Sequence, residues 1–154
     1  MTDLGSLTTL GVGGPAHRFF AIRRREEIVS AFAVADLRDE TLWLLGGGSN
    51  VVIADAGLPG TVVQIVGGQI GMRHVGDEAV EWTVDAGVAW DTFVTATVEA
   101  GATGVELLSG IPGTVGAAPV QNVAAYGQQV CDAITAVGVY DRDSGQTGEV
   151  PPEA

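Results

Sequence analysis

The hydrophobic positions of the chain follow two different periods, which predict two helices among several short strands. Apolar residues between Glu26 and Leu37 recur close to the helical repeat and follow acids in the first turn, a pattern that predicts a helix. A second helix is predicted from Asp91 to Ala100, with Asp91 capping its start and Gly101 ending it. Runs rich in β-branched and aromatic residues predict strands over 18–22, 42–45, 61–66, 71–75, 79–85, 134–140 and 146–150.

Turn residues between these segments predict how the strands connect. Gly76-Asp77 separates the strands over 71–75 and 79–85, and we expect the strands that follow residue 60 to form a meander. The apolar run over 42–45 enters consecutive glycines, which predicts a buried strand leading into a tight loop.

Length and composition predict one compact soluble domain. The chain has 154 residues, of which 46% are hydrophobic and 17% charged, and no apolar run is long enough to span a bilayer. Cys131 is the only cysteine, which excludes an internal disulfide and favours a reducing compartment. Asp3 stands where a secretory signal would carry positive charge. We therefore expect a cytoplasmic protein.

The charges exclude several kinds of site. All seven basic residues are arginines, so a Walker-type phosphate loop and a Schiff-base lysine are excluded. The net charge is −12, and residues 74–154 carry twelve acids against Arg142 alone. Nucleic acid and anionic membranes are therefore poor partners. One cysteine and the separated His17 and His74 cannot supply the usual zinc ligands. An anion bound in the second half must be held by backbone N–H groups.

Glycine clusters among the chain's 23 glycines are the first candidate sites. The segment from Gly11 to Ala16 fits the dinucleotide pattern G-x-G-x-x-A, but Pro15 and a predicted strand follow it, which favours a turn before a strand. Gly46 to Asn50 follow a predicted strand. Their N–H groups can converge on a phosphate without a lysine, and a tight turn between strands is the alternative.

A second glycine-rich segment extends from Ser109 to Gly116 and continues to Gly127. It is almost free of charge, and Gln121, Asn122 and Tyr126 add amide and phenol groups. A neutral loop of this length with polar side chains suits a planar heterocycle, and an ordinary packed loop is the alternative.

These motifs, in their order and spacing, resemble the UDP-N-acetylenolpyruvoylglucosamine reductase family, also called UDP-N-acetylmuramate dehydrogenase. The matching segments are Thr9–Ala16, Leu45–Asn50, Glu106–Gly116, Pro119–Asn122 and Ala125–Gln128. The glycine segments recur more widely among FAD domains of the vanillyl-alcohol oxidase (PCMH) type, whereas the Gln-Asn-x-x-Ala-Tyr-Gly run at 121–127 points to the reductase. Ala117 and Ala124 stand where the family usually has glycine, and Gln129 replaces a glutamate.

The resemblance implies an α+β FAD-binding domain of the PCMH type in two lobes, about 1–66 and an incomplete 67–154. It implies pyrophosphate contacts from Gly46, Gly47, Gly48, Ser49 and Asn50. It implies contacts to the flavin and ribityl chain from Gly110, Ile111, Pro112, Gly113, Thr114, Gly116, Asn122, Ala125, Tyr126 and Gly127. Asn50, Gln121 and Tyr126 are implied to approach the substrate.

The implied activity is reduction of UDP-N-acetylenolpyruvoylglucosamine to UDP-N-acetylmuramate in peptidoglycan synthesis, with NADPH as hydride donor and FAD as carrier. The family's catalytic serine, arginine and glutamate lie in a second half, and this chain ends at Ala154 before them. No catalytic or metal-binding residue is therefore assigned, and we expect a truncated form that is inactive alone.

Two other functions fit the same residues. One is an FAD-binding subunit or domain of another oxidoreductase with this fold, and the other is a non-catalytic nucleotide-binding module. We expect Cys131 to be a small buried hydrophobic residue. Arg23-Arg24-Arg25 is expected to form a solvated edge, with contact to a nucleotide phosphate as the alternative.

Overall fold

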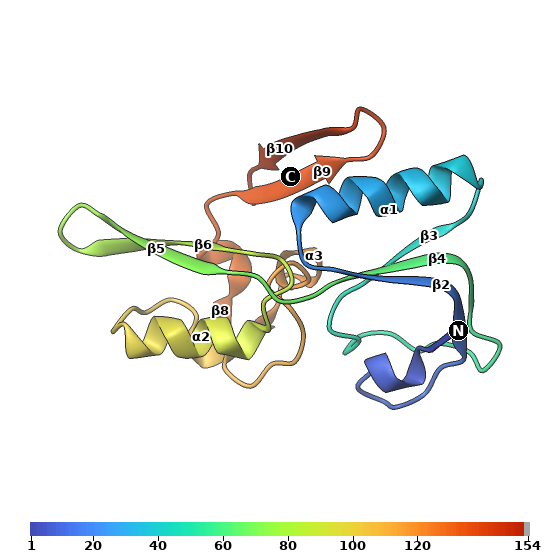
Figure 1. The fold of residues 1–154 in the computed structure, drawn as a ribbon. Helices are drawn as coiled ribbons and strands as arrows, with labels where there is room; N and C mark the ends of the chain where they lie inside the picture. Colours follow the sequence, from blue (N-terminus) through green and yellow to red (C-terminus); the bar gives the residue numbers. More distant parts are fainter. Residues whose placement is uncertain (153–154) are drawn as a thin grey trace. The chain divides into compact units, whose positions relative to one another are not determined.

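The computed structural model describes residues 1–152, except for the side chain of Arg25. The chain divides into two compact units, Met1–Gly67 (unit 1) and Gly68–Ala154 (unit 2), shown in Figure 1 in blue to green and in green to red. Among residues 1–152, no helix is both long and apolar enough to cross a membrane.

Unit 1 is built on a four-stranded sheet in the order β1-β2-β4-β3. The strands are β1 (Thr2–Asp3), β2 (Pro15–Ile22), β3 (Leu42–Leu45) and β4 (Leu58–Ile65). β2 and β3 both pair with β4 in parallel, while β1 pairs with β2 antiparallel. Ile22 is opposite Ile65 and Leu45 is opposite Gln64. The three parallel strands therefore end at the same edge of the sheet.

Each face of this sheet buries apolar side chains. Helix α1 (Arg25–Leu37) buries Ala31, Phe32 and Ala35, and it contacts β2 and β4. A core cluster is formed by Leu4, Ala16, Leu45, Ile53 and Val62, with Leu4 following β1 and preceding the short 3-10 helix η1 (Gly5–Leu7). The sheet with its covering helix is the frame from which the first glycine cluster emerges.

The start and end of α1 follow from local hydrogen bonds. The side chain of Glu27 accepts hydrogen bonds from the backbone N–H groups of Arg23 and Arg24 at 2.9 and 3.2 Å, which satisfies donors at the helix start. After the helix, Asp39 adopts a left-handed φ of 52°, which ends the helix without a glycine.

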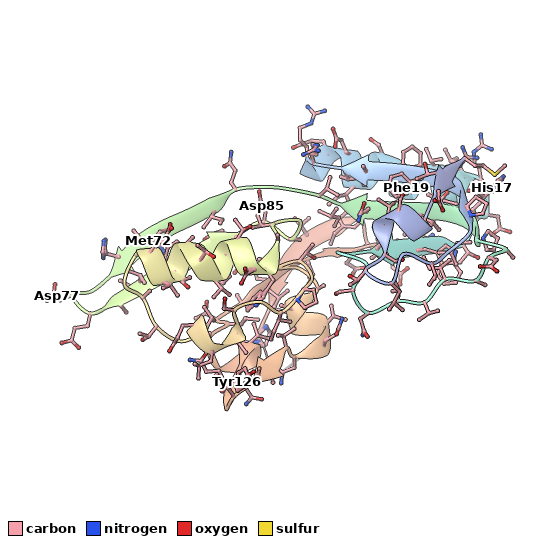
Figure 2. The ribbon with its side chains drawn as sticks, turned by 90° about the horizontal axis from the view of Figure 1, so that it is seen from below. His17, Phe19, Met72, Asp77, Asp85 and Tyr126 are labelled. Carbon is pink, nitrogen blue, oxygen red and sulfur yellow. The ribbon has the colours of Figure 1, made fainter. Side chains whose placement is uncertain are left out.

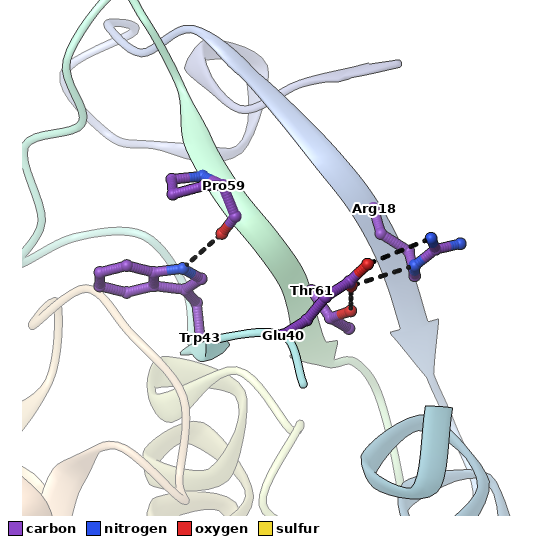
Figure 3. Close-up of polar contacts among 5 residues, drawn as sticks. All are labelled: Arg18, Glu40, Trp43, Pro59 and Thr61. Atoms are coloured by element: carbon purple, nitrogen blue, oxygen red, sulfur yellow. Dashed lines mark hydrogen bonds and ion pairs between the residues drawn. The ribbon is translucent and has the colours of Figure 1, made fainter. Parts of the chain in front are cut away.

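A polar cluster joins all three parallel strands of unit 1 (Figure 3). The buried Thr61 hydroxyl donates to Glu40 Oε2 at 2.6 Å, and Arg18 Nε lies 3.4 Å from the same oxygen. These two contacts, first Thr61 and then Arg18, lower the pKa of Glu40. Trp43 Nε1 donates to the Pro59 carbonyl at 2.8 Å. The cluster fixes the start of β3 beside β4.

The described part of unit 2 contains three two-stranded antiparallel hairpins and one main helix, α2 (Trp90–Glu99). The hairpins are β5 (Ile70–Val75) with β6 (Ala79–Val84), β7 (Ala124–Ala125) with β8 (Gln128–Gln129), and β9 (Val137–Asp141) with β10 (Gln146–Val150). The short helical segments are η2 (Glu106–Leu108), α3 (Ala118–Gln121) and η3 (Val130–Asp132).

The core of unit 2 forms around the start of α2. Trp90, Val94, Val105, Leu108, Ala118 and Val130 make up the buried cluster. The ring of Phe93 lies edge-on to Trp90 and to Trp82 of β6, with centroids 5.7 and 6.0 Å apart. Trp90 Nε1 donates to the Leu108 carbonyl at 2.9 Å, so the buried indole is satisfied.

Both predicted helices and most predicted strands are confirmed. α1, β3, the β5–β6 hairpin and β10 lie within one residue of their predicted bounds. A strand follows Gly11–Gly14, as predicted, but it begins at Pro15 and includes Ala16, so the predicted turn is shorter than Gly11 to Ala16. Gly101 ends α2 with a φ of 74°.

Several predictions about these elements are wrong. The strand predicted over 61–66 is β4, which pairs in parallel within unit 1 and not in a meander. β3 is an edge strand with Leu44 65% exposed, and not a buried strand. The strand predicted over 134–140 begins only at Val137, because Ile134 still donates its N–H to the Val130 carbonyl of η3.

Candidate functional site

The first glycine cluster, Gly46–Asn50, is termed glycine loop 1. It follows β3 directly, at the edge where β2, β4 and β3 all end. Ligands of open parallel sheets commonly bind at this edge, beyond the carboxyl ends of the strands. Arg23 follows β2 at the same edge and is exposed.

Glycine loop 1 is fixed through its carbonyl groups. The Gly46 carbonyl accepts a hydrogen bond from Gln64 Nε2 at 2.9 Å, and the Gly48 carbonyl accepts one from the Thr9 N–H at 2.9 Å. Gly48 is buried with a φ of +70°, and a Cβ there would lie 1.9 Å from the Leu7 carbonyl oxygen. Only glycine fits this position.

Unlike the carbonyl groups, most backbone N–H groups of glycine loop 1 take no part in hydrogen bonds within the described residues. Within residues 1–152, the N–H groups of Gly47, Gly48 and Asn50 donate no hydrogen bond to another residue. Gly47 and Asn50 are exposed, and Ser49 is half-buried. Uncommitted amide donors on a loop held by its carbonyls are a suitable arrangement for an anion such as a diphosphate.

The second cluster, Ser109–Gly116, is termed glycine loop 2. It is fixed along the segment 86–91 of unit 2. Val115 and Gly116 donate their N–H groups to the carbonyls of Val88 and Ala86 at 2.9 Å, and Trp90 donates its N–H to the Gly113 carbonyl at 3.1 Å. A Cβ on Gly116 would lie 2.6 Å from the Ala86 Cβ. Glycine at 116 is therefore required by packing, and its N–H is already used.

Asp91 is a residue of this site that the sequence prediction missed. Its Oδ1 accepts hydrogen bonds from the Gly110 N–H at 2.6 Å and from the Ser109 hydroxyl at 2.9 Å. These bonds, with Gly110 first, lower the pKa of Asp91. The predicted capping of α2 by Asp91 is wrong, because Ala89 is the N-cap and has no side-chain bond. The partners lie 18 and 19 residues away, beyond the reach of a local pattern.

The remaining amides of glycine loop 2 are open. Among the described residues, the N–H groups of Ile111, Gly113 and Thr114 donate to no other residue, and Pro112 has no N–H. Gly110 and Gly113 have φ values of +77° and +131°, conformations that favour glycine.

The segment from Gln121 to Gly127 carries the remaining predicted contacts. Asn122 has a φ of +43°, and its side chain accepts from the Cys131 N–H at 3.2 Å and donates to Gln129 at 3.3 Å. This side chain therefore braces the β7–β8 hairpin. Gln121 is exposed at the end of α3.

Tyr126 and Gly127 form the two-residue turn between β7 and β8, with φ values of +52° and +86°. Both values are typical of a type I′ turn. Tyr126 is 88% exposed, and its side chain is labelled in Figure 2. Ala124 has no left-handed φ, so its methyl group is tolerated where the family usually has glycine. This hairpin is not among the elements predicted from the sequence.

The structure brings two of the three predicted segments onto one core. Ile111 and Val115 of glycine loop 2 pack on the unit 2 core, as do Val123 and Ala125 next to the Tyr126 turn. Gln128 adds a link, since its Oε1 accepts the Leu107 N–H at 2.8 Å. Glycine loop 1 belongs to unit 1.

The arginines, the cysteine and the histidines named in the sequence analysis lie outside the two glycine loops. Arg24 pairs with Glu27 at 2.9 Å, and the side chain of Arg25 lies outside the described part. Cys131 is half-buried and not fully buried as predicted, because η3 lies at the surface of the unit. His17 and His74 are exposed.

Comparison with known proteins identifies the class to which these loops belong. The chain belongs to a family of FAD-binding domains, which it matches over residues 16–150 under the description "FAD binding domain".

Within that class, several similar proteins carry the name UDP-N-acetylenolpyruvoylglucosamine reductase. The reductase of Thermobifida fusca is 46% identical over 144 residues, which are 94% of this chain and 40% of that protein. The reductase of Saccharopolyspora erythraea is 44% identical over 97% of this chain and 41% of its own length. The crystal structure of the enzyme from Thermus caldophilus superposes with a TM-score of 0.80 at 31% identity, covering 99% of this chain and 52% of that one. The chain thus spans about two fifths of the curated relatives.

Proposed function

We propose that this chain binds FAD as the FAD-binding part of an NADPH-dependent reductase that converts UDP-N-acetylenolpyruvoylglucosamine to UDP-N-acetylmuramate. The observation that carries the proposal is 46% identity over 94% of the chain to a protein named for this activity. Because the chain spans 40% of that relative, catalysis is proposed for the whole protein and FAD binding for this chain.

The residues present fit the cofactor. In unit 1, the open amides of Gly47, Gly48 and Asn50 would hold the diphosphate, which suits a chain without lysine. In unit 2, Gly110, Ile111, Pro112, Gly113 and Thr114 would line the flavin and ribityl chain, with Asn122, Ala125, Tyr126 and Gly127 beside them. We place Gly116 in the packing of this loop, since its N–H is committed to Ala86.

Bound FAD would supply hydride transfer, and the protein would supply its orientation. Tyr126 offers an exposed ring for stacking, and Asn50 and Gln121 are exposed amide side chains that could bind a polar substrate. We propose that these three groups approach the UDP-sugar in the complete enzyme.

Retention of flavin by the purified chain tests the proposal. We expect flavin absorbance to co-elute with the protein after incubation with FAD, and the melting temperature to rise with FAD concentration, since a ligand that binds only the folded state stabilises it. A chain that stays colourless and gains no thermal stability would favour a module that does not bind FAD.

A matched pair of glycine substitutions tests where the diphosphate binds. Gly47→Val places a branched side chain beside the open amides of glycine loop 1, and we expect the Kd for FAD to rise at least about tenfold, a loss of roughly 1.4 kcal/mol. Gly148→Val in β10 is the control, because a Cβ there meets nothing within 4 Å and its φ is not left-handed. Equal effects of the two substitutions on Kd would contradict the assignment of loop 1.

A further inference from the structure

Residues Trp90 and Asp91 hold glycine loop 2 at two points. The Trp90 N–H donates to the Gly113 carbonyl at 3.1 Å, and Asp91 Oδ1 accepts the Gly110 N–H at 2.6 Å. The span between these two points contains Ile111 and Pro112. The loop is therefore fixed on both sides of the open amides of Ile111 and Gly113.

The start of α2 is a rigid support for this contact. Trp90 is 3% exposed, lies in the core of unit 2 and is itself bonded to the Leu108 carbonyl. Asp91, in the first turn of the same helix, therefore has a fixed backbone position. A hydrogen bond from an amide to a carboxylate is stronger than one between neutral groups.

The charge of Asp91 also indicates which part of a cofactor loop 2 can accept. A carboxylate bonded to Gly110 places negative charge at the loop, which disfavours a diphosphate there. The open amides of Ile111, Gly113 and Thr114 would face an uncharged group with polar atoms. The flavin ring and ribityl chain of FAD are such groups.

We infer that Asp91 is a positioning residue that fixes glycine loop 2 in the conformation that keeps its open amides available to the flavin side of the cofactor. The inference rests on the proposed function for the identity of the ligand. The fixing of the loop itself requires only the contacts of Asp91 with Ser109 and Gly110.

Three variants of the chain test this role. Asp91→Ala removes the acceptor, Asp91→Asn keeps an oxygen at the same place, and Glu99→Ala removes an exposed carboxylate from the other end of α2. Amide hydrogen exchange of residues 109–113 is measured without ligand, and FAD is titrated with the absorbance spectrum of the bound flavin recorded.

We expect Asp91→Ala to speed exchange of the Gly110 amide at least about tenfold, to raise the Kd for FAD by a similar factor, and to alter the flavin spectrum. Asp91→Asn should recover most of the affinity and the spectrum, and Glu99→Ala should behave as the unmodified chain. A residue with a merely structural role would change the melting temperature without changing the spectrum of the flavin that is bound.

Unchanged exchange over 109–113 in Asp91→Ala, or unchanged FAD affinity in a chain that binds FAD, would overturn the inference. If Asp91→Ala does not fold, Ser109→Ala, which removes one of the two donors to Asp91 Oδ1, replaces it, and unchanged exchange over 109–113 together with unchanged FAD affinity would have the same meaning. Failure of the unmodified chain to take up FAD contradicts the proposed function instead, and the exchange measurement then decides the role of Asp91 alone.

Discussion

At the scale of single residues, Glu40 shows how one carboxylate links folding to pH. Its pKa is lowered by the Thr61 hydroxyl and by Arg18. A carboxylate whose pKa is lower in the folded state stabilises that state above its unfolded pKa, and the contribution is lost as pH falls through the folded value. We expect the melting temperature to fall more steeply on acidification in the unmodified chain than in Glu40→Gln, which cannot ionise.

Calorimetry at a series of acidic pH values checks this prediction. Glu149→Gln in β10 is the control, because Glu149 is exposed and distant in sequence from the cluster. The difference between the unmodified chain and Glu40→Gln should shrink at the lowest pH, where Glu40 is protonated. Parallel curves for these two proteins would show that the contacts of Glu40 do not distinguish the folded from the unfolded state.

At the scale of elements, the β7–β8 hairpin carries an aromatic residue where turn chemistry disfavours one. Tyr126 has a φ of +52°, and Asn or Gly is preferred at this position of a type I′ turn. We expect Tyr126→Asn to stabilise unit 2 by about 1 kcal/mol. The same change should weaken FAD binding roughly 2- to 10-fold through loss of an aromatic contact.

Denaturant unfolding and FAD titration of Tyr126→Asn separate the two effects. Higher stability with lower affinity would show that the strained turn is kept for binding. An Asn variant that is less stable than the unmodified chain, or one that binds FAD equally well, would contradict this account of the turn.

Elements whose signals are local were predictable from the sequence. Acids in the first turn predicted the start of α1, and Gly101 predicted the end of α2. Alternating residues on both sides of Gly76-Asp77 predicted the β5–β6 hairpin. The parallel pairing of β4 was not predictable, because a run such as Val62-Val63 suits either orientation. The support of glycine loop 2 by Asp91 was missed for a related reason, since its partners come from a distant segment.

The candidate site was predictable only as far as its glycines and their resemblance to a family. The sequence places Gly48, Gly110 and Gly113 in loops, and the structure gives all three positive φ values. Which amides are open depends on tertiary hydrogen bonds, such as those that commit Val115 and Gly116 to the segment 86–88. The division of the loop amides into hydrogen-bonded and open groups decides which positions can contact a ligand. No residue pattern along the chain encodes this division.

At the scale of the whole molecule, the net charge of −12 opposes the binding of an anionic cofactor. If uncharged amides hold the diphosphate, the long-range electrostatic effect on FAD is repulsion, which salt screens as the Debye length falls from about 30 Å at 0.01 M to about 10 Å at 0.1 M. We therefore expect FAD to bind more tightly, or equally well, as ionic strength rises over this range.

A site built on cations has the opposite salt dependence, because screening then weakens an attraction. Arg23 is the cation that follows β2 at the edge where glycine loop 1 begins, so Arg23→Gln is the informative companion. Titrations of FAD into both proteins at several salt concentrations should give curves of the same slope if amides carry the diphosphate. A Kd that rises with salt in the unmodified chain, and a smaller rise in Arg23→Gln, would show that the Arg23 guanidinium group binds the diphosphate and that the glycine amides do not.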